Sequence, residues 1–250
     1  MNWKECNFND FAKLKRGYDL PNQNIIEGDY PVVASTSIKA FHKHFKSKAP
    51  GVVTGRSGSL GTVQYLAVDF FPLNTTLYVK DFKGNHPKFV YYFLQMMHLE
   101  NFNSGAGVPT LNQNHLHKLK IKIPLIETQK KIAAVLSAYD DLIENNKRRI
   151  ALLEKMAEEI YREWFVRMRF PGYKETKFEK GVPVGWKILA IDDISTEIRK
   201  GIKKKDLTSE LKYLGLEHLP RKSISITDFA TADSVNLKEF PVCLQRGFPY

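Results

Sequence analysis

The chain has 250 residues, of which 43% are hydrophobic and 12% aromatic, enough for at least one buried core and one or two domains. It contains no run of about 18 apolar residues and begins with a polar segment, so we expect neither a membrane span nor a secretory signal. The net charge of +11 is concentrated in residues 1–124, which carry 15 Lys and Arg against 8 Asp and Glu and suit a polyanion such as nucleic acid.

Residues 1–124 are predicted to form a mixed domain of short strands and helices. Runs rich in β-branched and aromatic residues lie between Gly, Pro and Asn turns, which indicates strands. The expected strands cover residues 30–34, 51–54, 62–67, 76–79 and 120–123. Apolar residues at helical spacing predict a helix over residues 86–99, and residues 112–118 could add a short one.

The segment from Gly51 to Gly61, GVVTGRSGSLG, carries the strongest local signal of this domain. Its glycines let the backbone approach a surface closely, while Arg56, Ser57 and Ser59 present a guanidinium and two hydroxyls. Such groups contact phosphates and base edges, and Arg is the commonest reader of guanine. The alternative is a tight hairpin with a surface Arg. The spacing fits neither a Walker loop nor a dinucleotide fingerprint.

Two further polar loops have the same character. One is the Gly-rich segment 103–110, and the other follows the expected strand at 30–34. Hydrogen-bonding groups on turns are typical of loops that read bases. In these two loops we expect nucleic-acid contacts at Ser35, Thr36, Lys39, Lys43, Ser104, Gly105 and Thr110. His42 and His44 could ligate a metal, but no Asp, Glu or Cys stands at ligand spacing, which favours a solvated basic strand.

Residues 125–169 predict one long helix with an apolar seam. The seam residues repeat at alternating steps of four and three, the heptad spacing of a coiled coil. They are Ile132, Leu136, Tyr139, Ile143, Asn146, Ile150, Leu153, Ala157, Ile160 and Trp164. No other segment has a matching heptad run, so we expect the seam to pack against another chain.

Asn146 is the polar residue near the middle of this seam. A buried Asn at such a position commonly fixes the register and the number of helices in a coiled coil. The alternative is that Asn146 faces solvent at a point where two helices diverge.

Residues 171–250 partly repeat the start of the chain. Trp3-Lys4 is followed by Asp10 and Gly17, and Trp186-Lys187 is followed by Asp193 and Gly201, at an offset of 183 residues that holds to within one. Such self-similarity suggests a second, shorter copy of the first domain, with a plausible hairpin around residues 212–226.

Catalytic signatures such as GxSxG, HExxH and the DPPY- or NPPF-like motif of adenine methylation do not occur in the sequence. Acidic pairs such as Asp140-Asp141 lie on the predicted helix, where solvated charge is the default interpretation. Cys6 and Cys243 lie far apart and outside metal-binding spacing, which fits a reducing cytosol. We therefore expect a non-catalytic cytoplasmic protein without a metal site.

The order of the motifs resembles the DNA-specificity subunit of type I restriction-modification systems over almost the whole chain. The motifs are YPVVAST, GVVTGRSGSLGTV, FPLNTTLYV, IPL-x-x-x-Q at the start of the long helix, DDLIENNKRRIALLE within it, and FPG followed by GVPVGWK after it. The resemblance implies an α+β fold with a globular target-recognition domain over residues 1–124. A long coiled-coil spacer helix over 125–170 and an incomplete second recognition domain over 171–250 would follow.

The resemblance also implies a role. Members of this family bind double-stranded DNA with two recognition domains, each of which reads one half of a bipartite target, while two long helices pair antiparallel. Methyltransferase subunits dock on this scaffold, and a motor-nuclease subunit joins for cleavage. This chain would itself bind no cofactor, and the partner subunits would bind S-adenosylmethionine, ATP and Mg.

The second recognition domain stops near Tyr250, as expected of a truncated or half-sized subunit. We therefore expect a homodimer, formed through an antiparallel helix pair, that restores a bipartite target with identical, inverted half-sites. Two alternatives stay open. The chain could be an inactive truncated subunit, or a scaffold that bridges protein subunits without touching DNA.

Overall fold

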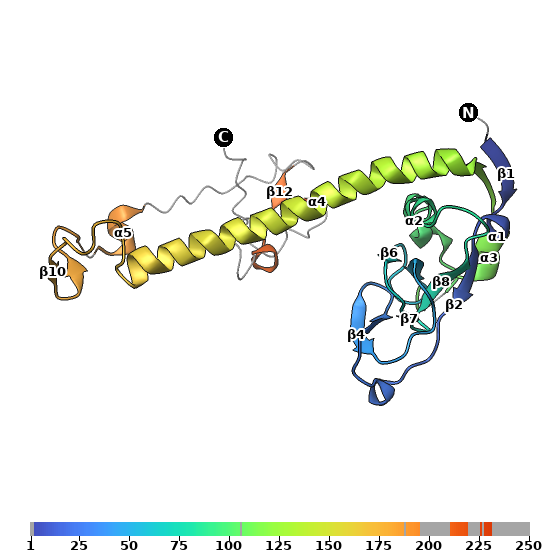
Figure 1. Cartoon of the computed structure of the whole chain (residues 1–250), viewed down its shortest axis with the longest axis horizontal. Helices are drawn as coiled ribbons and strands as arrows, with labels where there is room; N and C mark the ends of the chain where they lie inside the picture. The colour runs from blue at the N-terminus through green and yellow to red at the C-terminus, as the bar shows by residue number, and fades with distance from the viewer. Residues whose placement is uncertain are drawn as a thin grey trace, which may run out of the picture. The chain divides into compact units, whose positions relative to one another are not determined.

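The structure, a computed structural model, describes residues 3–105, 107–187, 189–195, 211–219, 226 and 228–231. The chain divides into two compact units, Met1–Glu144 and Asn145–Tyr250. The long helix α4 (Ile126–Tyr161) runs from the first unit into the second (Figure 1). Short strands and helices make up the first unit, which confirms the α+β fold class.

The strands described in the first unit form three sheets. They are β1 Trp3–Asn7, β2 Lys13–Arg16, β3 Tyr30–Val33, β4 Ile38–His42, β5 Gly51–Gly55, β6 Val63–Leu66, β7 Phe71–Pro72, β8 Thr76–Asp81 and β9 Lys120–Pro124. The largest sheet has the order β2-β8-β5-β6, with every neighbouring pair antiparallel. A second has the order β4-β3-β7, in which β3 is antiparallel to β4 and parallel to β7. The third is the antiparallel pair β1-β9.

The five strands expected from the sequence are all present, with bounds that differ by at most two residues. The strands β1, β2, β4 and β7 were not expected. Three of them are rich in charged or exposed residues, as in the KLKR run of β2, and β7 has two residues. Such strands lack the apolar alternation that identifies a half-buried strand.

The core of the first unit lies between the four-stranded sheet and the helix α2 (Pro87–Met96), which contacts β5 and β6. Phe89, Val90 and Leu94 of α2 are buried, as their spacing on one helix face predicts. The helix is shorter than the expected range 86–99. Met97 caps it, and the left-handed backbone of His98, with φ of 49°, prevents its continuation.

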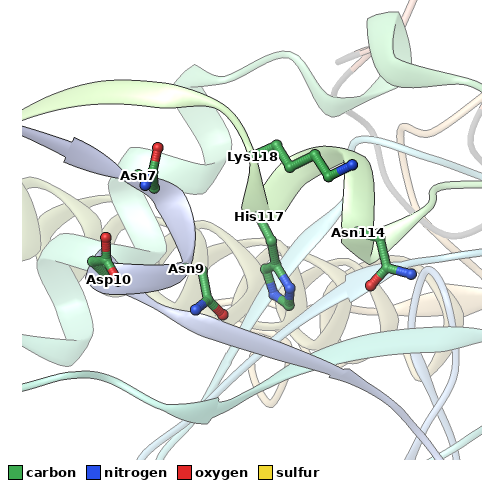
Figure 2. Close-up of a pocket in the computed structure, with 6 residues that line it drawn as sticks. All are labelled: Asn7, Asn9, Asp10, Asn114, His117 and Lys118. Carbon is green, nitrogen blue, oxygen red and sulfur yellow. The ribbon is translucent and has the colours of Figure 1, made fainter.

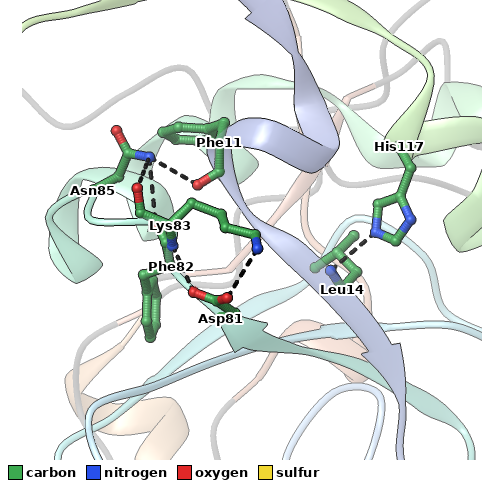
Figure 3. A network of polar contacts seen from close by, with 7 residues as sticks. All are labelled: Phe11, Leu14, Asp81, Phe82, Lys83, Asn85 and His117. Atoms are coloured by element: carbon green, nitrogen blue, oxygen red, sulfur yellow. Dashed lines mark hydrogen bonds and ion pairs between the residues drawn. The ribbon is translucent and has the colours of Figure 1, made fainter.

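Two short helices, α1 (Phe8–Phe11) and α3 (Gln113–His117), pack beside this core. The α3 helix confirms the short helix expected over residues 112–118, and the Asn112 side chain caps it by accepting from the Asn114 backbone N–H. Figure 3 shows two contacts that fix these elements: His117 Nε2 accepts from the Leu14 N–H at 3.0 Å, and Asn85 donates to the Phe11 carbonyl at 2.8 Å.

Gln129 anchors the first turn of α4 to the same unit. Its side chain is 2% exposed and makes three hydrogen bonds that leave no polar atom without a partner. Oε1 accepts from the His86 N–H at 3.0 Å, while Nε2 donates to the Asn85 side chain at 2.7 Å and to the Pro124 carbonyl at 3.0 Å. This residue is the Gln of the IPL-x-x-x-Q motif, so the motif joins the helix to the domain that precedes it.

Most of the α4 seam is exposed in the single chain. Tyr139, Ile143, Ile150 and Leu153 each expose at least half of their surface. Ile132 differs, because it is half-buried against the core of the first unit and so has a partner within the chain. None of the helices among the described residues combines the length and apolarity that a membrane span requires.

The helix ends slightly earlier than Arg169, the end expected from the sequence. Beyond Tyr161 the backbone widens into a π-helical turn over Arg162–Val166, closed by a hydrogen bond from the Arg167 N–H to the Arg162 carbonyl at 2.8 Å. Met168 then adopts a left-handed φ of 53°, which ends the helical run.

Aromatic residues of the second unit pack together after the end of the helix. The Trp186 ring lies 5.6 Å from the Phe170 ring and 6.0 Å from that of Phe165. Two short hairpins are described, β10 (Phe178–Glu179) with β11 (Val182–Pro183) and β12 (Lys212–Tyr213) with β13 (Ala230–Thr231). The hairpin expected around 212–226 therefore closes with a strand beyond Ile226.

The internal repeat is supported by the position of the helix α5 (Ile191–Ile194). It lies 183 residues after α1 at both of its ends, the offset that separates Trp186 from Trp3. Gly201 of the repeat and the segment from Cys243 to Tyr250 lie outside the described residues.

Candidate functional site

The ends of three neighbouring strands lie side by side at one end of the four-stranded sheet. In the antiparallel register Arg16 at the end of β2 faces Leu77, and Gly55 at the end of β5 faces Thr76 at the start of β8. The turn before β8, the loop after β5 and the end of β2 are therefore adjacent. We call this end of the sheet, together with the loops at residues 34–37, 55–61, 73–75 and 103–111, the loop edge.

The Thr75 carbonyl oxygen holds two of the predicted loops together. It accepts hydrogen bonds from the backbone N–H groups of Arg56, at 2.8 Å, and Ser57, at 3.1 Å. The Ser35 hydroxyl lies 2.9 Å from the same oxygen and 3.1 Å from the Ser57 carbonyl. The loop after β3 and the loop after β5 are thus joined through the turn that separates β7 from β8.

The third predicted loop, residues 103–111, pairs with the second. The Leu111 N–H donates to the Arg56 carbonyl at 2.8 Å, and the Gly58 N–H donates to the Pro109 carbonyl at 3.0 Å. Within this loop, the Asn103 side chain accepts from the N–H groups of Gly105 and Thr110, both at 2.9 Å, and Ser104 donates to the Thr110 carbonyl. All three loops that the sequence singled out therefore lie together, although the sequence did not predict their contact.

The loop after β5 combines features of both interpretations made from the sequence. It connects β5 to β6 as a hairpin, and Gly58 adopts a left-handed φ of 84° that suits glycine. A Cβ at Gly55 would lie 2.0 Å from the Ser59 carbonyl oxygen, so only glycine fits there. Arg56, however, is half-buried and its backbone is fully hydrogen-bonded, so it is not a free surface side chain.

Two guanidinium groups converge on the Asn74 carbonyl oxygen. Arg56 donates to it through one terminal nitrogen at 3.4 Å, and Arg16 donates through Nε at 3.3 Å. Burial, and secondly the positive charge of Arg16, lower the pKa of Arg56. Arg16 was not among the residues predicted from the sequence, where its only signal was the basic run KLKR before Gly17.

Lys39 and Lys43 belong to a different part of the first unit. The Lys39 ammonium donates to the Asn22 side chain at 2.7 Å, and the Lys43 N–H donates to the Ile26 carbonyl at 2.9 Å. They lie on and just after β4, and their described bonds lead to residues 22–26 rather than to the loop edge. Thr36 and Ser59 are exposed on their loops.

The interpretation of His42 as part of a solvated strand is wrong. The residue is 5% exposed, and its Nδ1 accepts from the Ile26 N–H at 3.0 Å. The ring packs at 5.7 Å from that of Phe71, so His42 links a loop to the three-stranded sheet. Among the described residues, no group of three or more His, Cys, Asp or Glu side chains could hold a metal ion.

A polar groove lies between α1 and α3, which the sequence gave no reason to expect (Figure 2). Its volume is about 650 Å³, and it is lined by Asn7, Asn9, Asp10, Asn114, His117 and Lys118. Burial, reinforced by the charge of Lys13, lowers the pKa of His117. Because His117 Nε2 already accepts from the Leu14 N–H, this ring serves the fold.

Comparison with protein families gives one match over most of the chain. A family model described as the type I restriction modification DNA specificity domain matches residues 1–155. This range contains the loop edge and most of α4.

Curated relatives have the same description. The chain is 28% identical over 206 residues to the specificity subunit of the type I restriction enzyme MjaIX of Methanocaldococcus jannaschii, an alignment that covers 74% of this chain and 46% of the relative. It is 28% identical over 145 residues to the EcoprrI specificity subunit of Escherichia coli, which covers 56% of this chain and 36% of that protein. The chain thus spans about half the length, or less, of these two relatives.

A solved structure has a similar fold. The S subunit of the type I restriction-modification system of M. genitalium superposes with a TM-score of 0.57 at 23% identity, covering 66% of this chain and 46% of that one. At this identity the likeness concerns the fold.

Proposed function

The chain belongs to the family of type I restriction modification DNA specificity domains, and from this premise we propose that it binds double-stranded DNA sequence-specifically through the loop edge. In this role it is the specificity subunit of a type I restriction-modification complex and performs no catalysis itself. The expected DNA contacts on the loop edge are Ser35, Thr36, Arg56, Ser57, Ser59, Ser104, Gly105 and Thr110. Lys39 and Lys43, on and just after β4, are expected contacts outside this edge.

One observation carries this proposal: three polar loops, separated by up to 75 residues in the chain, are hydrogen-bonded into one surface. The Ser35–Ser57 contact and the Ser57–Thr110 bridge join them directly. Loops held on a rigid sheet can present donors and acceptors at fixed distances, which base recognition requires. The excess of Lys and Arg in residues 1–124 supplies the attraction to phosphate groups.

The proposal assigns the chemistry to partner subunits. Methyltransferase subunits would bind S-adenosylmethionine, and a motor-nuclease subunit would bind ATP and Mg, while this chain chooses the DNA site. Because these partners act on DNA inside the cell, the proposal places the protein in the cytoplasm.

For α4 we propose the role of a spacer that pairs antiparallel with the helix of a second copy. The exposed seam residues Leu136, Tyr139, Ile143, Ile150, Leu153, Ile160 and Trp164 would form the contact, with Asn146 near its centre. A two-fold axis between antiparallel helices would place two identical recognition units in inverted orientation. The DNA target would then contain two inverted half-sites.

The direct test is an equilibrium titration of the full chain with labelled duplex DNA, alone and with a methyltransferase subunit of the same genome, at several salt concentrations. We expect binding that weakens linearly on a log–log plot as salt rises, since released counterions drive it. A chain that assembles with the methyltransferase subunit but adds no affinity for any duplex would instead be a protein scaffold.

A further inference from the structure

The pair Arg16 and Arg56 stands out at the loop edge because two like charges share one acceptor. Both guanidinium groups donate to the Asn74 carbonyl oxygen, at 3.3 and 3.4 Å. Arg16 comes from the end of β2 and Arg56 from the loop after β5. The two residues lie close together because β2 and β5 pair with opposite sides of β8. The sheet brings the two residues together, with Arg56 half-buried and Arg16 exposed to solvent.

Within the described part of the chain, neither guanidinium forms an ion pair with a carboxylate. The Asp19 carboxylate is linked to this site only through Asn74, because it accepts a hydrogen bond from the Asn74 side-chain amide. A carbonyl oxygen carries only a partial negative charge, so it offsets little of the repulsion between two full positive charges. The pair therefore retains unused donors and an uncompensated charge.

The geometry of Arg56 does not suit a reader of bases. Such an Arg extends into the major groove and uses both sides of its fork on one guanine. Here the side chain is half-buried, one terminal nitrogen is held by the Asn74 carbonyl, and the backbone on both sides is bonded to Thr75 and Leu111. Its guanidinium group shares the Asn74 carbonyl oxygen with that of Arg16, so the two groups are held close together.

We propose that Arg16 and Arg56 together bind one phosphodiester group of the DNA backbone. This inference rests on the proposed function and deepens it, because it assigns Arg56 to positioning the DNA rather than to reading a base. A phosphodiester group shares one negative charge between two non-bridging oxygens, so each of the two guanidinium groups can donate to it. The phosphate contact fixes the register in which the exposed groups of the neighbouring loops meet the bases.

The test compares Arg16→Ala, Arg56→Ala and the double variant with the unaltered full chain, in titrations of the duplex that the chain prefers and of one unrelated duplex over a salt series. Each single substitution should lower the affinity for both duplexes by the same factor, about tenfold, and reduce the slope of log K against log salt by about one. Lys80→Ala is the matched control, because it removes one exposed charge from the far end of β8. For each duplex, its slope of log K against log salt should differ less from that of the unaltered chain than the slopes of the two Arg variants do. Arg56→Met keeps most of the side-chain volume if Arg56→Ala does not fold.

A change confined to the preferred sequence, with unrelated duplexes bound as before, would overturn the phosphate assignment and make Arg56 a base reader. A second readout separates this inference from the proposed function. In NMR titrations with inorganic phosphate, the side-chain Nε–H signals of Arg16 and Arg56 should shift together, and Arg16→Ala should weaken the Arg56 shift severalfold. Failure of the unaltered chain to bind any duplex would contradict the proposed function. If phosphate does not shift the Arg16 and Arg56 signals together, the shared phosphate contact of these two residues is contradicted.

Discussion

The Tyr92 hydroxyl on α2 donates a hydrogen bond to an Asp140 carboxylate oxygen on α4 at 2.6 Å. This contact lies roughly four helical turns beyond the start of α4, given 3.6 residues per turn. Together with the buried side chain of Gln129 in the first turn, it ties α4 to the first unit at two separate points. Two such points hold the first part of α4 against the rest of the first unit.

Replacing Tyr92 by Phe should remove this second tie while keeping the ring packing. We expect a loss of about 0.5–1.5 kcal/mol in the free energy of unfolding of the first unit, the usual contribution of one hydrogen bond. Hydrogen exchange should become faster in α4 around Asp140 and stay unchanged in its first turn. The control is Asp141→Asn, because Asp140 is the carboxylate that accepts from Tyr92. Equal effects of the two variants would show that the hydrogen bond does not hold the helix.

Gln129→Leu should be more damaging, because it leaves buried partners without a bond. The His86 N–H and the Pro124 carbonyl would both lose their partner, at a cost of about 2–3 kcal/mol in the free energy of unfolding. Lys130→Leu on the same turn is the matched control. It removes an exposed ion pair with Glu127 and should change stability by less than about 0.5 kcal/mol. Urea unfolding of both variants measures the difference, and similar losses would contradict the role of Gln129 as an anchor.

His117 should make the first unit sensitive to mild acid. Burial lowers its pKa in the folded chain below the ordinary value of 6.5, and Nε2 must stay unprotonated to accept from the Leu14 N–H. The unfolded chain takes up a proton near 6.5 while the folded one does not, so the contribution of His117 is complete above that pH and is lost as the pH falls through the lowered folded value.

Unfolding free energies measured at several pH values between neutral and mildly acidic should therefore decline for the unaltered chain. His117→Gln keeps an acceptor that does not titrate and should flatten this decline. His115→Gln, an exposed neighbour on the same helix, should not. A decline of the same steepness in all three proteins would show that another group controls it.

The pairing of the α4 seam can be tested with two adjacent leucines, one in the seam and one outside it. Leu152 and Leu153 are 61% and 62% exposed in the single chain, but the heptad spacing includes Leu153 alone. If the seam pairs with a second copy, Leu153→Ser should raise the dimer dissociation constant at least about tenfold, since a buried Leu contributes roughly 1.5–3 kcal/mol. Leu152→Ser should have little effect. Light scattering over a dilution series would reveal both, and an unaltered chain that stays monomeric would rule out the helix pair.

The sequence predicted the fold best where apolar residues alternate or repeat. The strands around Val32, Val53 and Leu77 and the helix from Ile126 follow directly from such patterns. It did not predict β2, whose basic residues lack the alternation of a half-buried strand but pair with β8. The three polar loops were found because each combines turn residues with hydrogen-bonding side chains. Their contact depends on the strand order β2-β8-β5-β6, which no local pattern encodes.

The role of Arg16 could not be predicted for the same reason. Its partner Asn74 lies 58 residues away in the chain, and only the pairing of β2 with β8 brings the two together. His42 shows the opposite error, because a His between basic residues suggested solvent while the ring is buried and bonded to Ile26. Burial of a polar side chain depends on the neighbours that the fold supplies, and composition alone does not reveal them.

Selection of bound DNA from a random-sequence duplex library tests the central claim most directly. The full chain, with a methyltransferase subunit of the same genome, is mixed with the library, and the bound fraction is sequenced. We expect enrichment of one bipartite sequence with inverted half-sites, lost when the exposed loop residues Thr36 and Ser59 are replaced by bulky side chains. A bound fraction with no enriched sequence at any salt concentration would contradict the claim that this chain recognises a DNA sequence.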